Sequence, residues 1–163
     1  MNTRSSHKND SSGGSSPETN IKWDELQLLT PLRTKLYVPP LRSGWISRPR
    51  LDKRMYQGFE RKLTLISAPA GFGKTTLLVD WIHRHKIPAA WFSVDKGDND
   101  PLHFLTYVIL GLQSSEAGIG KAALTMLQSP QAQPIEPILI NLLNDVSRIS
   151  TDLALILRFL SSD

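Results

Sequence analysis

Cysteine is absent from the 163 residues of this chain. A disulfide framework and a cysteine-based zinc site are therefore excluded, and the composition fits a reducing compartment. No apolar run approaches the length that a helix needs to cross a bilayer. The first eight residues are followed by more polar residues and not by the apolar segment of a secretory signal, so we expect a cytoplasmic protein with no membrane partner.

Excess charge is also small. The net charge is +4, which could aid contact with phosphates but does not by itself argue for nucleic-acid binding. The hydrophobic content of 40% permits a real core in one domain of ordinary size. Composition then divides the chain into a polar tail at 1–20, which we expect to be disordered, an extended arm with a short helix at 21–60, and a more apolar region at 61–163.

A glycine-bearing loop lies between an apolar run at 63–66 and an amphipathic segment at 77–82. This order of strand, loop and helix is the context in which the pattern G-x-x-x-x-G-K-[ST] binds phosphate. The first glycine of the pattern is replaced by alanine here, while the final G-K-T is present. The loop residues are Ala68, Pro69, Ala70, Gly71, Phe72, Gly73, Lys74, Thr75 and Thr76. We therefore interpret 61–163 as a partial P-loop nucleotide-binding domain.

Each residue type in the loop has a physical reason to be there. Gly71 and Gly73 let the backbone curl through dihedrals that a Cβ disfavours, so that several N–H groups point at one spot. Lys74, the candidate catalytic residue, can reach the β- and γ-phosphates. The Thr75 hydroxyl can ligate Mg²⁺, which prefers oxygen, and the Thr76 hydroxyl can meet the α-phosphate.

The remaining pattern predicts an α/β fold. Apolar runs at 63–67, 89–94 and 153–157 predict strands, the second one buried on both faces of a parallel sheet. Helices are predicted at 51–57, 74–85, from Pro101 through Leu112, at 121–128 and at 138–146, and 21–29 is either a brief helix or a packed arm. We expect a P-loop NTPase-like parallel sheet flanked by helices and incomplete at the C-terminus.

Acidic residues follow the second strand. Asp95, Asp98 and Asp100 do not have the register of a calcium loop, so we interpret them as a strand-end turn and, at Asp100, a helix N-cap before Pro101. Asp95 stands at the sheet edge where ligands bind in open α/β folds and is a candidate helper of the site. Two histidines, at 83 and 85, do not share a helix face, which argues against a metal site there.

The strand predicted at 153–157 is followed by Arg158, Phe159 and Leu160. In a phosphate-loop nucleotidase, the second carboxylate on the magnesium side typically terminates such a strand. Since no acid stands at that point, we expect weak or no hydrolysis.

Four blocks of sequence resemble the N-terminal nucleotide-binding domain of the large ATP-dependent transcriptional activators of the maltose-regulator type. These belong to the LuxR-type regulators and to the signal-transduction ATPases with numerous domains. The blocks are 31–40, 47–51, 63–78, and 90–95 with 98–101 and Phe104. Alanine at the first glycine position is common in that family, and a strand ending in paired aspartates is expected where this chain has Arg158-Phe159.

The resemblance implies ATP binding by Gly71, Gly73, Lys74 and Thr75, with Arg48 near the adenine side. From the pattern alone, Arg48 is a surface charge. The resemblance also implies a switch in which ATP favours self-association and a distant helix-turn-helix contacts DNA. No helix-turn-helix can be placed in this sequence, so we expect a truncated regulator with no direct DNA contact.

Two alternatives remain open from the sequence. The chain could be a small P-loop ATPase or kinase, with Asp95 or Asp98 as the acid near the γ-phosphate. It could also be a non-functional truncated remnant whose sheet cannot close.

Overall fold

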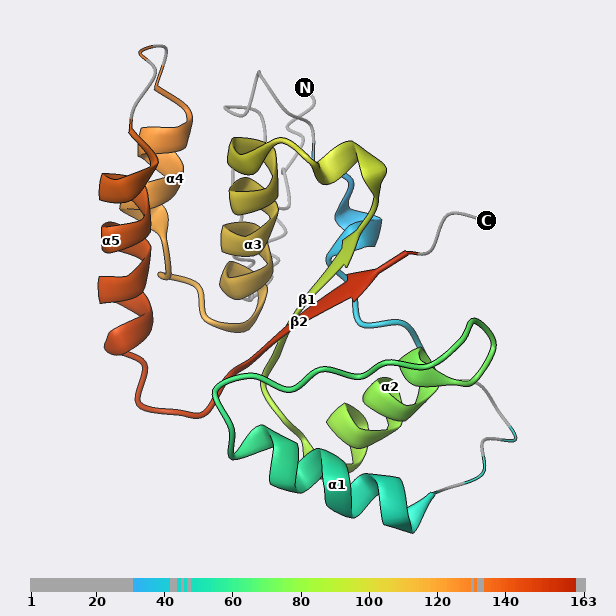
Figure 1. Cartoon of the computed structure of the whole chain (residues 1–163). Coiled ribbons are helices and arrows are strands. Elements are labelled where there is room, and N and C mark those ends of the chain that lie inside the picture. The colour runs from blue at the N-terminus through green and yellow to red at the C-terminus, as the bar shows by residue number, and fades with distance from the viewer. Residues whose placement is uncertain are drawn as a thin grey trace, which may run out of the picture.

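The computed structural model describes residues 31–41, 44, 46, 48–129, 131 and 134–160. The predictions for 1–20 and 21–29 lie outside these residues. The described chain forms helices and two strands in an α/β arrangement (Figure 1). The helices are α1 (Pro49–Phe59), α2 (Lys74–His85), α3 (Pro101–Ser115), α4 (Lys121–Leu127) and α5 (Ile135–Ser147), with short 3-10 helices at Arg33–Lys35 and Lys96–Asp98, and the strands are β1 (Ala89–Val94) and β2 (Ala154–Phe159).

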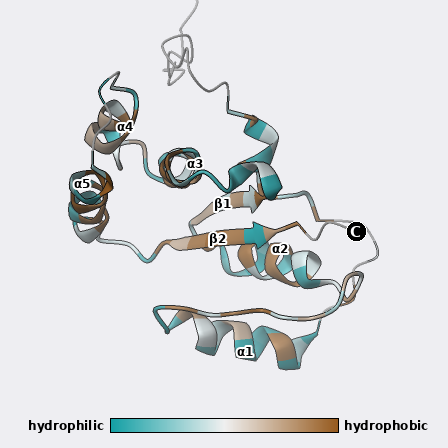
Figure 2. Cartoon of the chain, turned by 45° about the horizontal axis from the view of Figure 1, so that its top comes forward, coloured by the Kyte–Doolittle hydropathy of each residue, from teal (hydrophilic) through white to brown (hydrophobic). Residues whose placement is uncertain are grey.

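The two strands are parallel neighbours, with Ala89 opposite Ala154 and Val94 opposite Phe159. Helices α3, α4 and α5 lie on one side of them, and α1 and α2 lie on the other (Figure 1). Figure 2 shows the largely apolar strands between these two helical layers. The predicted α/β class and the parallel pairing are thus present, in a two-stranded sheet over the described residues.

Strand β1 is buried on both faces because its side chains alternate between the two layers. Phe92 and Val94 pack into the cluster formed with α3, α4 and α5, whereas Trp91 packs into the cluster formed with α1 and α2. Trp91 and Phe92 are both fully buried. This explains why β1 was predictable as a continuous apolar run, and its bounds match the prediction of 89–94.

The helices largely follow their predicted signals. The Asp100 side chain accepts a hydrogen bond of 2.7 Å from the His103 N–H, and Pro101 is the first residue of α3, as predicted. Helix α1 extends the predicted 51–57 by two residues at each end. Helix α5 begins at Ile135 and not at 138, because Pro137 falls in the first turn, where a proline costs the helix no hydrogen bond.

The predicted strand at 63–67 is wrong. These residues form neither helix nor strand, and Leu63 and Leu65 are 85% and 87% exposed. The Thr64 hydroxyl donates a hydrogen bond of 2.7 Å to the Gly58 carbonyl, which ties the segment to the last turn of α1. An apolar run becomes a strand only when its backbone groups find a partner strand, and β2 pairs with β1.

No helix in the described part of the chain is long and apolar enough to cross a membrane.

Candidate phosphate-binding site

The loop before α2 has the backbone shape that its glycines permit. Gly71 and Gly73 have φ angles of +79° and +78°, in the left-handed region that favours glycine. A Cβ at either position would meet nothing within 4 Å. Backbone conformation, and not crowding, is therefore the reason for glycine at both positions.

Helix α2 begins directly after this loop, with Lys74 as its first residue and Gly73 as its N-cap. Glycine has no side chain to cap the helix, so the N–H groups of the first turn lack a side-chain acceptor there. The first backbone hydrogen bond of the helix runs from the Leu77 N–H to the Gly73 carbonyl, at 2.9 Å. The N–H groups before it and the positive end of the helix dipole are free to act on an anion.

The Lys74 ammonium lies over the loop. It donates hydrogen bonds to the carbonyl oxygens of Ala68 and of Pro69, the latter at 3.0 Å. An ammonium has three N–H donors, so one remains for a further acceptor. The loop thus holds a cation at the N-terminus of α2, with one donor uncommitted.

The Thr75 hydroxyl, in the first turn of α2, accepts a hydrogen bond of 3.0 Å from Nε of Arg158. Arg158 lies near the C-terminal end of β2, on the same strand face as Ile156, which packs toward α1 and α2. This hydrogen bond connects β2 to α2 through two residues that are 83 positions apart in the sequence. Sequence reasoning noted Arg158 only as the residue that stands where an acid is expected. The alternation of side chains along β2 was the signal that could have predicted that Arg158 faces α2.

Magnesium is expected at Thr75 from the sequence, but the residues around this hydroxyl fit the metal poorly. Among the described residues, no carboxylate is hydrogen-bonded or ion-paired to Lys74, Thr75 or Arg158, and no group of three metal-binding side chains occurs. Mg²⁺ is normally held through one or two carboxylates together with the phosphates. Here the neighbour of the hydroxyl is a guanidinium, whose positive charge repels a metal ion.

Asp95 and Asp98, the two acids considered for the site, have structural partners. Asp95 accepts a hydrogen bond from the Gly97 N–H, and Asp98 accepts one from the Asp95 N–H, both at 2.8 Å, so the pair caps the short helix after β1. Lys35 bridges both carboxylates at 2.8–2.9 Å. These contacts account for the acids without a ligand.

The same contacts shift the pKa values of Lys35 and Asp95. The hydrogen bond from Lys35, aided by the Gly97 N–H, lowers the pKa of Asp95. Burial disfavours the charged ammonium of Lys35, but the hydrogen bonds to Asp98 and Asp95 outweigh it and raise the pKa of Lys35. Lys35 therefore ties the segment at 33–36 to the acidic turn at the end of β1.

The other predicted site residues lie on or near the surface. Phe72, at the tip of the loop, is 63% exposed, and Thr76 is half-buried in the first turn of α2. Arg48 is exposed, and its carbonyl oxygen accepts the N–H groups of Leu51 and Asp52 at the start of α1. Its contact with an adenine stays a prediction.

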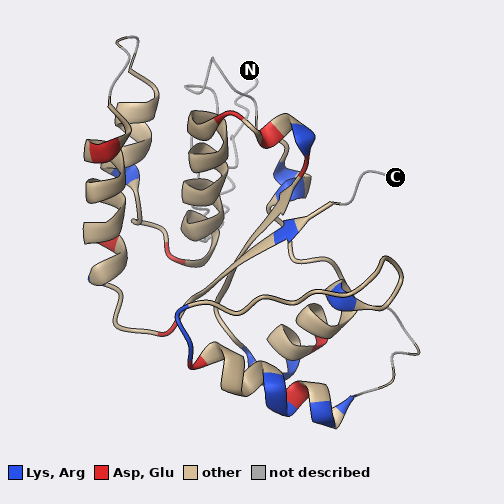
Figure 3. Ribbon diagram, viewed as in Figure 1, with Lys and Arg blue, Asp and Glu red and all other residues tan. Residues whose placement is uncertain are grey.

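Positive charge gathers on the side of the molecule that carries the loop. Residues 48–86 hold nine basic and three acidic side chains, whereas residues 95–160 hold four basic and seven acidic ones. Figure 3 shows many of the basic residues on and around α1 and α2, with others on the two short helices, on β2 and at the start of α4. The field of the α1–α2 side therefore attracts a polyanion.

The chain has partial similarity to known transcriptional regulators. No protein-family model matches it. It is 35% identical over 98 residues to the HTH-type transcriptional regulator MalT of Cronobacter sakazakii, an alignment that covers 60% of this chain and 11% of the relative. The MalT regulators of Serratia proteamaculans and Klebsiella pneumoniae are 36% identical over 85 residues and 35% identical over 98 residues, which cover 52% and 60% of this chain and 9% and 11% of the relatives.

This similarity supports a relationship between this chain and MalT-like transcriptional regulators. It agrees with the resemblance to maltose-type activators that the sequence blocks indicated. The chain spans about a tenth of the length of the MalT relatives it matches.

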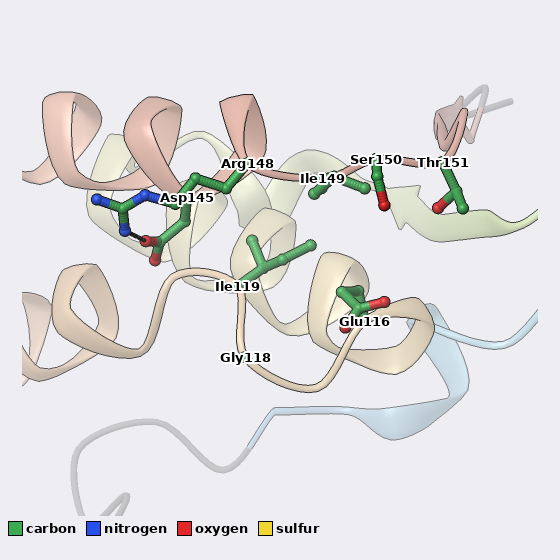
Figure 4. Close-up of a pocket in the computed structure, with 8 residues that line it drawn as sticks. All are labelled: Glu116, Gly118, Ile119, Asp145, Arg148, Ile149, Ser150 and Thr151. Carbon is green, nitrogen blue, oxygen red and sulfur yellow. Dashed lines mark hydrogen bonds and ion pairs between the residues drawn. The ribbon is translucent and has the colours of Figure 1, made fainter.

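A separate cavity of about 310 Å³ lies between the loop after α3 and the segment after α5 (Figure 4). Two of its charged side chains are paired with each other. Arg148 contacts Asp145 at 3.4 Å, and the other carboxylate oxygen of Asp145 accepts the Gly120 N–H at 2.9 Å. No residue of the loop at 68–76 lines this cavity, so it is not part of the candidate phosphate site.

Proposed function

We propose that this chain is the ATP-binding module of a MalT-like transcriptional regulator, with weak or no ATP hydrolysis. The observation that carries the proposal is the loop at 68–76. Two glycines with left-handed backbone lead into α2, and the Lys74 ammonium donates hydrogen bonds to the carbonyl oxygens at the start of the loop. The similarity to MalT regulators supports the regulatory context.

Binding on this proposal is electrostatic. The uncapped N–H groups of the first turn of α2 and the remaining donor of Lys74 converge on the phosphates. The basic side of the molecule raises the local concentration of the anion. Phe72 and Arg48 are the exposed side chains that we propose to lie toward the base.

Hydrolysis requires more than affinity. A group must position or activate the attacking water, and a metal ion is normally held by a carboxylate at the end of the neighbouring strand. In the described chain Arg158 stands at that strand end, and Asp95 and Asp98 are bound to Lys35. Slow or absent turnover follows, with the nucleotide acting as a ligand of a switch.

A regulatory role suggests that bound ATP favours self-association, as the resemblance implies, and that the protein acts in the cytoplasm, where bacterial DNA is read. The exposed apolar side chains Leu63, Leu65 and Phe159 offer surface for such association.

The test is ATP binding by the whole chain and by Lys74→Ala, measured by isothermal titration calorimetry with and without Mg²⁺. A hydrogen bond to a charged group contributes about 1.5–3 kcal/mol, so we expect the variant to bind about 10-fold to 100-fold more weakly. Lys121→Ala, which removes an exposed lysine at the start of α4, is the charge-matched control and should bind like the wild type. Thermal unfolding of each protein checks that the loop change has not unfolded the chain.

Two results would contradict the proposal. If the chain shows no measurable affinity for millimolar ATP both with and without Mg²⁺, the binding role is removed. Steady phosphate release by the purified wild type would favour the ATPase or kinase alternative instead.

A further inference from the structure

The residue that stands in place of the expected acid is in direct contact with the loop. Nε of Arg158 lies 3.0 Å from the Thr75 hydroxyl, the oxygen expected to hold Mg²⁺. We propose that Arg158 takes the place of magnesium at this loop, so that the chain binds the metal-free triphosphate. This inference rests on the proposed function and concerns the form of the nucleotide that the site accepts.

The geometry leaves most of the guanidinium available. A guanidinium has five N–H donors in a rigid plane, and the bond to Thr75 uses one of them. For the others, the structure records no acceptor among the residues it describes. The planar fork matches two oxygens of a phosphate, and Thr75 fixes its position beside the first turn of α2.

The balance of charge at this point favours a bound anion. Positive side chains are unfavourable at the N-terminus of a helix, where the dipole is already positive. Yet Lys74 and Arg158 both lie there, and no described carboxylate pairs with either. A polyanion relieves this repulsion, and the triphosphate without its metal carries more negative charge than the magnesium complex.

The same geometry works against the metal. The Thr75 oxygen already accepts a donor from a cation, and a magnesium ion bound to that oxygen would lie beside the guanidinium. Because the described residues supply no carboxylate there to offset the repulsion, the metal and Arg158 compete for one position.

The experiment compares ATP binding by the whole chain in EDTA and in excess Mg²⁺, by isothermal titration calorimetry. We expect the affinity in EDTA to equal or exceed that in Mg²⁺. Arg158→Gln should weaken binding in EDTA by about 10-fold or more, since charge-assisted hydrogen bonds to the phosphates are lost. Arg148→Gln makes the same charge change at an arginine whose side chain is 79% exposed on the α5 side, and it should leave both affinities unchanged.

A second variant tests for gain of metal dependence. Arg158→Asp puts a carboxylate at the strand end, so its binding should be weak in EDTA and recover in Mg²⁺. Arg158→Lys keeps the charge but loses the planar fork, and its affinity in EDTA should lie between those of the wild type and Arg158→Gln. Circular dichroism melts of every variant establish that the helices remain folded.

The outcomes separate the two proposals. Wild-type binding that appears only with Mg²⁺ would overturn the role of Arg158 and leave the ATP-binding role standing. An equal loss in EDTA and in Mg²⁺ for Arg158→Gln would also overturn it, because a merely structural contact affects both alike. A wild type that binds in neither buffer removes the proposed function itself. The wild-type comparison needs no variant, so a variant that fails to fold does not prevent the test.

Discussion

Replacing Lys35 by methionine should destabilise the fold through one buried acid. The Lys35 ammonium lies 2.9 Å and 2.8 Å from the two carboxylate oxygens of Asp98 and 2.9 Å from Asp95. The Lys35 side chain is 11% exposed, the Asp98 side chain 0% and the Asp95 side chain 39%. Methionine keeps most of the aliphatic length of the side chain but removes its charge, so Asp98 stays buried without its counter-ion.

The size of the effect follows from what Asp98 retains. Breaking a buried ion pair by removing one partner costs about 3–5 kcal/mol, because the other charge is left uncompensated. Asp98 still accepts the Asp95 N–H at 2.8 Å, and Nδ1 of His103 lies 3.5 Å away. These contacts place the expected loss of unfolding free energy at the lower end of the range, about 3 kcal/mol.

Urea unfolding followed by tryptophan fluorescence measures this loss, with the buried Trp91 and Trp81 as reporters. A loss of about 3 kcal/mol, with a urea slope of about 1–3 kcal/mol/M, lowers the midpoint by roughly 1–3 M. Asp95→Asn is the matched control: it removes the more exposed pair but keeps an oxygen for the Gly97 N–H, so its midpoint should move little. Equal losses in the two variants, or no loss in Lys35→Met, would refute the reasoning.

Two further predictions concern stability. Gly120 has a φ of +67°, and a Cβ there would meet Cγ2 of Ile109 at 2.7 Å, so Gly120→Ala should cost about 2–4 kcal/mol from strain and overpacking. Gly73→Ala, with a similar φ but open space around it, should cost only about 1–2 kcal/mol, and equal losses in urea melts would contradict the steric part. Stability should also fall at both extremes of pH. Asp95, whose pKa is lowered, stabilises the fold above its ordinary pKa of 3.8 and loses that contribution as the pH falls below it. Lys35, whose pKa is raised, contributes fully below its ordinary 10.5 and loses its contribution as the pH rises above it, and Lys35→Met should flatten both limbs of a series of melts.

Local signals in the sequence predicted the elements that surround the loop. The apolar run at 89–94 predicted β1, and Asp100-Pro101 predicted the start of α3, because a cap and a fixed proline φ act within a few residues. The glycines of the loop predicted an unusual backbone conformation, and both Gly71 and Gly73 have left-handed φ angles. Each of these inferences depends on forces that a short window of sequence contains.

Contacts between distant segments were harder to foresee. The apolar run at 63–67 has the composition of a strand, but a strand exists only if its backbone groups find a partner, and the Thr64 bond to Gly58 holds this segment against α1 instead. The pairing of Arg158 with Thr75 depends on how β2 lies against α2. The motif alone predicts magnesium at Thr75, but it contains no information on the contact of Thr75 with Arg158.

The cation at the end of β2 also bears on how such a switch would be reset. A nucleotide switch that works by hydrolysis needs a positioned water and a metal to stabilise the leaving phosphate. On the proposed function, Arg158 would stabilise charge on the phosphates but would not act as a base, because a guanidinium has donors and no acceptor. A site built from Lys74, Arg158 and the amides of α2 would therefore return to its free state by releasing intact ATP. The lifetime of the bound state would then be set by the dissociation rate, which Arg158→Gln should increase in EDTA while phosphate release stays absent.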